Sequence, residues 1–379
     1  MEVFLGIIIG LIVLTILVII HELGHAIVAL RSGVVVEEFG IGFPPRAWAK
    51  KLKNKILLSI NWLPLGGFVR FKGEYDSADK AGDYGSVSYW QKTKILFAGV
   101  AMNWLAAFVI ISGLTLFGLP KMIPNQFYIK SDAVVINDPV QLSSISDKLP
   151  AQKAGLKVGD EVIDFNGKVV GSTDELITLI KQNESKTIEL TYRRNGQNKT
   201  IEIDLGTKTD NGILGAGLAQ RQFIKSTWSA PIVGFVDTVQ LTWATVQGLG
   251  DILYNLTTGF FGQFSPDTGT STQAKQNLAN VSQTTTGPIG IFTYLFPAAT
   301  QSGSVQVFLL AAIISLNLAI MNILPIPALD GGRWFTMTVY RLSKKELTKE
   351  TEESIQAIGF YVLMVLTLLV TIADVSKLF

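Results

Sequence analysis

Residues 3–30 have the sequence VFLGIIIGLIVLTILVIIHELGHAIVAL, a long apolar run that contains one short group of ionisable side chains. The part from Phe4 to Ile20 carries no charge. As a helix rising about 1.5 Å per residue, that part nearly crosses a hydrocarbon core about 30 Å thick. Glu2 stands where a signal peptide carries basic residues, and no small-residue cleavage site follows, so we expect a retained first span. Ionisable side chains inside such a span are expensive and indicate function.

The ionisable group is the motif HELGH at residues 21–25. His21 and His25 stand four residues apart, so on a helix both imidazoles project from one face and could bind one metal ion. Glu22 is one residue further round the helix and could reach a water molecule on that metal. The alternative is a pair of core histidines with a glutamate that extends to the membrane surface. The chain has only 2 histidines, both in this motif, which favours the metal site.

The composition indicates an integral membrane protein. Hydrophobic residues make up 48% of the chain and charged residues 16%, well below the roughly 25% charged residues of soluble domains. The net charge of +2 favours no acidic partner, and we expect no binding of nucleic acid. The absence of cysteine excludes disulfides, thiolate zinc sites and cysteine nucleophiles. A zinc ion with three protein ligands would therefore need at least one carboxylate.

Four segments are apolar enough to span a bilayer. They are about Val3–Leu30, Ile95–Leu119, Val305–Leu324 and Ile358–Ala373. Lysine and arginine gather in the loop 31–94 and in the loop after the third segment. The positive-inside rule therefore places both loops in the cytoplasm, and it places both termini and the long stretch between the second and third spans outside.

These features predict a polytopic α-helical membrane protein with an inserted extracytoplasmic α/β domain and a small membrane-associated β-sheet. Val34–Val36, 56–62 and 67–71 are β-branched or aromatic runs separated by turn residues, and they predict the sheet. An exposed edge of that sheet could pair with an unwound substrate segment. The predicted divisions are 1–125 with two spans and the sheet, 126–207 for the α/β domain, 208–304 for interfacial helices and a loop, and 305–379 with the last two spans.

The α/β domain at 126–207 resembles a PDZ domain in the circularly permuted form of bacterial proteases. The sequence AGLKVGDEV at 154–162 matches a PDZ signature, and a helix over 172–182 with Ser172 or Thr173 as N-cap follows. A hairpin over 187–205 closes the domain.

Residues 228–262 are amphipathic and aromatic, with polar and glycine interruptions. They predict one or two helices at the membrane interface, with a hidden fifth span as the alternative. Residues 264–284 are rich in serine, threonine, glutamine and asparagine and predict a loop.

The sequence NILPIPALDGG at 322–332 supplies a candidate third metal ligand. Its prolines end the third span, and Asp330 follows between a leucine and two glycines. The alternative is an ordinary turn. Counted at about 1.5 Å per residue, His21 lies about 27 Å into the first span and Pro325 about 30 Å into the third. Both spans run in the same direction, so His21, His25 and Asp330 are expected at one level near the cytoplasmic face.

Two histidines and an aspartate leave a fourth zinc position open, as in catalytic sites. Zinc lowers the pKa of water towards about 7, and Glu22 could then act as general base. Asn322 could donate a hydrogen bond to the substrate backbone or to the oxyanion. A hydrogen bond between helices explains Asn322 equally well, and it explains Asn103 and Asn317 better.

Together the two motifs and the single PDZ-like unit resemble the site-2 protease family of intramembrane zinc metalloproteases, and within it the bacterial RseP-like regulators of sigma-E. The resemblance covers nearly the whole chain in order and includes PLGGFV at 64–69 and TGPIG at 286–290. It implies zinc at His21, His25 and Asp330, and Glu22 as catalytic base.

The resemblance also implies a multi-pass protein of the bacterial cytoplasmic (inner) membrane. Its expected activity is regulated intramembrane proteolysis of single-span substrates, such as anti-sigma factors or signal-peptide remnants. The chain departs from the family pattern in having one PDZ-like unit where proteobacterial members have two. It also has valine after Gly99, where proline is usual. An alternative function is an inactive PDZ-bearing membrane scaffold with a structural metal site. The oligomeric state, and any ligand of the PDZ groove, stay open.

Overall fold

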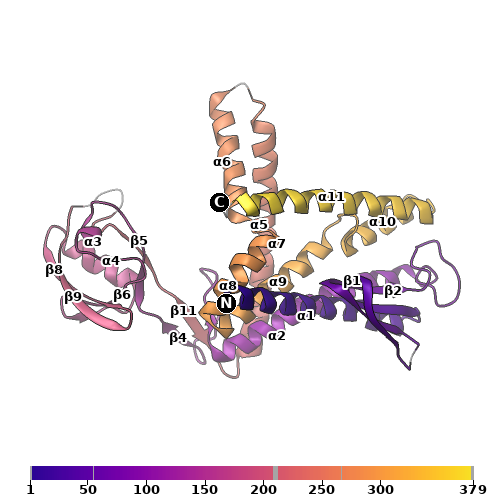
Figure 1. The fold of residues 1–379 in the computed structure, drawn as a ribbon, viewed down its shortest axis with the longest axis horizontal. Coiled ribbons are helices and arrows are strands. Elements are labelled where there is room, and N and C mark those ends of the chain that lie inside the picture. Colours follow the sequence, from indigo (N-terminus) through magenta and orange to yellow (C-terminus); the bar gives the residue numbers. More distant parts are fainter. Residues whose placement is uncertain (1, 54, 208–211, 266, 377–379) are drawn as a thin grey trace. The chain divides into compact units, whose positions relative to one another are not determined.

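Four helices in the described part of the chain are long and apolar enough to cross a membrane, as expected of a membrane protein. The computed structural model describes residues 2–53, 55–207, 212–265 and 267–376. The four helices are α1 (Glu2–Arg31), α2 (Tyr89–Phe117), α9 (Ser304–Ile323) and α11 (Lys349–Ser376), and each overlaps one predicted span (Figure 1). The last helix begins at Lys349, before the predicted span. Its first turns are polar, so hydropathy did not assign them to the span, but they are helical.

The chain divides into two compact units. The membrane unit comprises Met1–Leu114 and Gly234–Phe379, and the small unit comprises Thr115–Val233. In the membrane unit, α1 ends where Gly33 adopts a left-handed conformation with φ of 84°, a conformation that glycine adopts without strain. The amide of Val34 then donates to the Ala29 carbonyl at 3.0 Å, which turns the chain from the helix into the sheet.

A sheet of four strand segments follows α1, because β1 (Val36–Lys51) and β2 (Leu57–Phe71) each bend and pair twice. The central segments 36–41 and 57–60 run parallel, and each outer segment is antiparallel to its neighbour. The register gives the order 67–71, 36–41, 57–61, 46–51. At the bend of β1, Gly42 has φ of 79°, and an added Cβ would lie 2.5 Å from the Leu63 carbonyl oxygen. The sheet packs on the end of α1 through a buried apolar cluster that includes Ala29, Val36 and Phe71.

The small unit contains a six-stranded sheet with two short helices. Its path is β10–β5–β6–β8–β9, with β7 paired to β6. The elements are β5 (Val140–Ile145), α3 (Pro150–Lys153), β6 (Glu161–Phe165), β7 (Lys168–Val169), α4 (Thr173–Gln182), β8 (Thr187–Arg194), β9 (Gln197–Asp204) and β10 (Ala216–Ala219). Ser172 is the N-cap of α4, and its hydroxyl accepts from the Glu175 amide. Strands and helices enclose a core that includes Val162, Phe165 and Leu190.

The small unit extends beyond the predicted range 126–207 at both ends. Ile213 and Leu214 belong to its core, and β10 completes its sheet. A second sheet of β3 (Leu119–Pro120), β11 (Gln222–Lys225) and β4 (Val134–Asn137) uses residues from both ends of the unit. The sequence around β10, Ala-Gly-Leu-Ala, has no alternating pattern, so its place in the sheet is set by pairing with β5.

The predicted loop at 264–284 is wrong, because α6 (Thr268–Thr284) is a helix. Asp267 caps its N-terminus by accepting from the Thr270 amide. The helix packs against α5 (Ala230–Gly262), where Asn277 donates to the Thr258 hydroxyl at 2.9 Å and Ala274 is buried. Capping and packing override the low helix propensity of this polar segment. The placement of α5 at the membrane interface stays a prediction.

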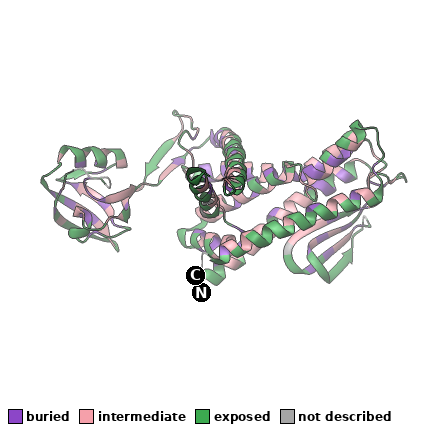
Figure 2. Cartoon of the chain, turned by 90° about the horizontal axis from the view of Figure 1, so that it is seen from above, coloured by how far each residue is buried: buried purple, intermediate pink, exposed green. Residues whose placement is uncertain are grey.

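Short helical segments connect α6 to the third span. They are α7 (Pro288–Gly290), the π-helical η1 (Ile291–Leu295) and α8 (Phe296–Ser302), and α10 (Asp330–Leu342) lies between α9 and α11. Along the long helices many side chains are exposed (Figure 2), among them Phe360, Leu366 and Leu369 of α11, each at least half exposed. Such a surface suits contact with lipid tails, which are as apolar as leucine.

Candidate metal centre

Three side chains from two helices meet at one point in the membrane unit. The Nε2 atoms of His21 and His25 are 3.1 Å apart, and Asp330 Oδ2 lies 3.2 Å from the first and 3.3 Å from the second. In a tetrahedral site, atoms bonded to one zinc ion at about 2.05 Å lie about 3.3 Å apart. The three separations therefore match the spacing of zinc ligands.

Asp330 Oδ2 also has the chemistry of a metal ligand. It is buried and accepts no hydrogen bond, although burial of an unsatisfied carboxylate oxygen is costly. The two imidazole nitrogens that face it belong to α1, and Asp330 is the first residue of α10. A cation at the point where the three atoms converge would satisfy all of them, so the residues fit a zinc ion.

The second ring nitrogen of each histidine is held by α2. His25 Nδ1 lies 2.8 Å from the Ile95 carbonyl oxygen, which can only accept a hydrogen bond. Nδ1 of His25 therefore carries the proton, and its Nε2 keeps a lone pair for a metal. His21 Nδ1 lies 3.3 Å from the Asn103 amide nitrogen.

Asn103 orients His21. Its side chain is fully buried and its Oδ1 atom has no hydrogen-bond partner. With the carboxamide turned by 180°, Oδ1 accepts from the Nδ1–H of His21, which satisfies the amide oxygen and leaves His21 Nε2 free for a metal. The sequence interpretation of Asn103 as an interhelical polar contact is confirmed, because His21 belongs to α1 and Asn103 to α2, but it did not identify the imidazole as the partner. Gly99 and Asn103 lie four residues apart on α2, and that spacing was the available signal.

Two glycines bring α2 close enough to α1 to hold both rings. A Cβ added to Gly24 would lie 2.4 Å from the Ala98 carbonyl oxygen. A Cβ added to Gly99 would lie 2.3 Å from His25 Nε2 and 2.7 Å from His21 Cε1. Any larger side chain at either position would push the helices apart or enter the metal position.

Asp330 reaches the histidines because the chain breaks between α9 and α10. The helix α9 ends at Ile323, before the two prolines, as the sequence predicts. Added Cβ atoms at Gly331 and Gly332 would lie 2.1 Å and 1.9 Å from the carbonyl oxygens of Ile323 and Ile326. The first turn of α10 thus packs directly on the preceding backbone, which only glycine permits.

Glu22 lies on the sheet side of the centre. It is half-buried, its Cγ is 3.5 Å from the position of a Cβ added to Gly67, and its carboxyl accepts from the Val69 amide. Both imidazoles and Asp330 act on it electrostatically. Asn322 lies half-buried in the last turn of α9.

Similarity to known proteins extends over almost the whole chain. Residues 9–366 match the family described as Peptidase family M50. The Regulator of sigma-W protease RasP of Bacillus subtilis is 29% identical over an alignment that covers 96% of this chain and 96% of the relative. A putative zinc metalloprotease of Clostridium perfringens is 29% identical over 97% of this chain and 98% of its own length.

The PDZ domain of an SdrC-like protein from Listeria monocytogenes is 26% identical over 22% of this chain and 88% of that chain, with a TM-score of 0.20.

The family match confirms the resemblance to site-2 proteases that the two sequence motifs indicated. The similar proteins include several named as zinc metalloproteases, and the convergent residues of this chain fit the same ion. The chain therefore belongs to peptidase family M50, the site-2 proteases, and is a zinc-dependent intramembrane metalloprotease.

Proposed function

We propose that the chain cleaves single-span membrane proteins, with zinc held by His21, His25 and Asp330 and with Glu22 as general base. The observation that carries the assignment of the ligands is the triangle of atoms 3.1 Å, 3.2 Å and 3.3 Å apart. One of the three is a buried carboxylate oxygen that has no hydrogen-bond partner. Bound zinc supplies a Lewis acid that polarises the scissile carbonyl and lowers the pKa of water.

Glu22 performs the proton transfers in this proposal. Its carboxylate removes a proton from the attacking water, the oxygen of that water bonds to the carbonyl carbon, and the C–N bond breaks. Glu22 then gives the proton to the leaving amine, so that one water molecule is consumed for each bond cut. The Val69 amide, which donates to the Glu22 carboxyl, holds the base on the side of the sheet. Asn322 is proposed as a hydrogen-bond donor to the substrate backbone or the oxyanion.

The edge strand 67–71 is the proposed binding site for the substrate backbone. It pairs with 36–41 on one side and passes beside Glu22 at Gly67. A substrate helix must unwind to expose a peptide carbonyl, and an unwound segment can add to a strand edge. The relative from Bacillus subtilis is named Regulator of sigma-W protease RasP, which supports anti-sigma factors as one substrate class. Remnant signal peptides are a second class.

The proposed setting is the bacterial cytoplasmic membrane, with the metal centre near its cytoplasmic side. The basic residues of loop 31–94 support a cytoplasmic sheet. Both termini and the small unit, which we propose to be a PDZ domain, then lie outside. The signature at 154–162 supports that assignment.

Cleavage of a single-span reporter reconstituted in vesicles with the full chain tests the proposal. Glu22→Gln is expected to lower the cleavage rate by about 10²–10⁴-fold and to leave the zinc content unchanged. Glu346→Gln, a substitution of an exposed carboxylate between α10 and α11, is the matched control and should cleave normally. Undiminished cleavage by Glu22→Gln would remove Glu22 as the base. If the unsubstituted chain bound zinc but cleaved no reporter, the result would favour the alternative function, an inactive membrane scaffold with a structural metal site.

A further inference from the structure

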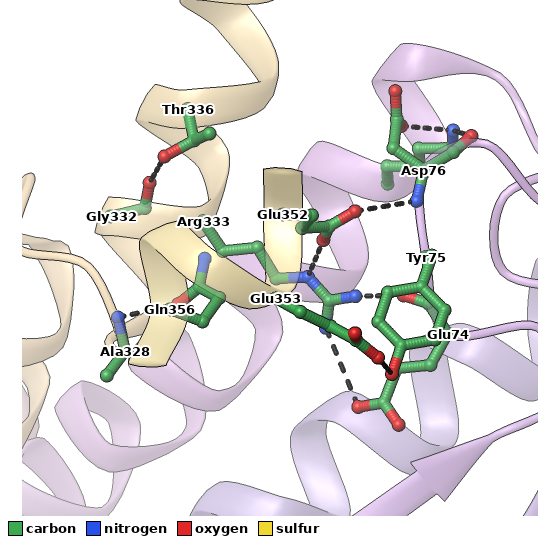
Figure 3. Close-up of polar contacts among 11 residues, drawn as sticks. Glu74, Tyr75, Asp76, Ala328, Gly332, Arg333, Thr336, Glu352, Glu353 and Gln356 are labelled. Carbon is green, nitrogen blue, oxygen red and sulfur yellow. Dashed lines mark hydrogen bonds and ion pairs between the residues drawn. The ribbon is translucent and has the colours of Figure 1, made fainter. Parts of the chain in front are cut away.

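Arg333 lies one turn after Asp330 on α10, and three segments of the membrane unit hold its guanidinium (Figure 3). Nε donates to Glu352 Oε1 at 3.0 Å. Nη2 donates to the Glu74 carbonyl oxygen, and Nη1 is 3.6 Å from the Glu74 carboxylate. The guanidinium also stacks on the Tyr84 ring, 4.8 Å from its centre.

The charges in this cluster are largely removed from solvent. The Arg333 side chain is 20% exposed and that of Glu352 only 4%. Buried charges destabilise a protein unless they are paired and fully hydrogen-bonded. Glu352 meets this condition, because one of its oxygens accepts from Arg333 and the other accepts from the Asp76 amide at 2.9 Å. Glu352 therefore joins α10, the first turn of α11 and the segment 74–76 that follows the sheet.

Two further contacts tie the same elements together. Tyr75 donates its hydroxyl hydrogen to Glu353 at 2.6 Å. The Ala328 amide, two residues before Asp330, donates to Gln356 at 2.6 Å. Because Gln356 and Glu352 both belong to α11, polar contacts hold the chain to this helix before Asp330, at Ala328, and after it, at Arg333.

Packing alone does not fix Asp330 on this side. A cavity of about 410 Å³ opens beside it, lined by Asp330, Arg333, Glu352 and their neighbours. The glycines press the other side of α10 on the preceding backbone. On the cavity side, polar contacts of Arg333 and of the Ala328 amide oppose rotation of the first turn.

We propose that Arg333 is a positioning residue that, through Glu352 and the segment 74–76, holds α10 in the orientation that presents Asp330 to the two histidines. This inference rests on the proposed zinc site. Metal ligands must be held to within about 0.5 Å of their productive positions. Loss of a residue that orients a ligand typically weakens metal binding about 10–100-fold.

Zinc affinity, measured by competition with a chromophoric chelator on the full chain in detergent, tests the inference. Arg333→Met keeps the aliphatic stem and removes every ion pair, and we expect zinc binding to weaken about 10–100-fold. Saturating zinc should restore the cleavage rate without a change in KM. Arg341→Met is the matched control, because Arg341 lies on the same helix and stacks on Tyr89 at 4.7 Å. Its zinc affinity should not change.

A milder substitution guards against loss of folding. Glu352→Gln keeps the shape and an acceptor oxygen but removes the charge, so it should weaken zinc binding less than Arg333→Met. In both variants, hydrogen exchange of residues 330–342 in the metal-free chain should become faster than in Arg341→Met. If Arg333→Met does not fold, Glu352→Gln decides the question by the same two measurements.

The outcomes separate this inference from the proposed site. His21→Ala should abolish high-affinity zinc binding. If it does not, the proposed zinc site fails, and the inference fails with it. If His21→Ala loses zinc while a folded Arg333→Met or Glu352→Gln binds zinc as tightly as the unsubstituted chain, the site stands and the positioning role of Arg333 is overturned.

Discussion

Gly99 of α2 faces His25 of α1 so closely that a Cβ built on the glycine would lie 2.3 Å from the imidazole Nε2. The nitrogen at this contact is the one that points to Asp330. A methyl group at position 99 would thus occupy the region that the three candidate ligands share.

Gly99→Ala should therefore abolish zinc binding and reduce cleavage by at least about 100-fold, the loss expected when reacting groups are displaced by about 1 Å. Gly113→Ala is the matched control on the same helix, because an added Cβ there meets no atom within 4 Å. Metal analysis of both purified variants checks the prediction. Zinc content in Gly99→Ala equal to that of the control would mean that α1 and α2 can separate without disturbing the site.

Asn103→Ala should weaken zinc binding about 10–100-fold, because the carboxamide holds the ring of His21 in place. Ser315→Ala is the comparison, since its hydroxyl donates to the backbone carbonyl of Asn103 at 2.8 Å and does not touch the histidine. That variant should lose about 1 kcal/mol of unfolding free energy and keep its zinc affinity. Chelator competition and thermal unfolding separate the two effects. Equal zinc affinities in the two variants would contradict an orienting role for Asn103.

The sequence was sufficient to locate the spans and to predict that the two metal motifs meet. Continuous apolar runs locate spanning helices, and the count of residues along α1 and α9 placed both motifs at one depth. The face of α2 that meets α1 cannot be predicted from the pattern of apolar residues, because α2 is apolar nearly all round. The contacts of Gly99 and Asn103 with the imidazoles therefore required coordinates.

The remaining differences between the sequence predictions and the structure have a common physical cause. The polar helix α6 exists because α5 packs against it, and β10 is a strand because it pairs with β5. Arg333 looked like one basic residue of a cytoplasmic loop, whereas its partners Glu74 and Glu352 come from distant parts of the chain. Tertiary partners decide each of these features, and local sequence does not name them.

Zinc should stabilise the membrane unit and leave the small unit unchanged. All three candidate ligands belong to the membrane unit, and a ligand that binds only the folded state stabilises it by about 2.7 kcal/mol at 100 times its Kd. Hydrogen exchange of the full chain with and without zinc checks this. Protection should rise around residues 21–25 and 330–342 and stay constant in β8 and β9. His21→Ala should show no rise, and a rise in that variant would place the stabilising zinc elsewhere.

Protonation of the Asp160 carboxylate in acid should lower the stability of the small unit. This buried carboxylate accepts from Arg194 Nε and Nη2, both at 2.6 Å, and from the Lys157 amide at 2.8 Å. Burial opposes its ionisation, but these hydrogen bonds outweigh burial and lower the pKa of Asp160 below its usual value of 3.8. A carboxylate with a lowered folded-state pKa stabilises the fold above its unfolded pKa of about 3.9, and the stabilisation disappears as the pH falls through the folded value.

Hydrogen exchange of β8 and β9 in the full chain, corrected for the intrinsic exchange rate, should therefore show protection that is constant near neutral pH and falls below about pH 4. Asp160→Asn should lower protection by about 1–3 kcal/mol near neutral pH, because Arg194 loses its charged partner, and should flatten the acid dependence. Asp174→Asn, at the first turn of α4, is the control and should keep the acid dependence of the unsubstituted chain. If Asp160→Asn kept the same acid dependence, another group would be responsible for it.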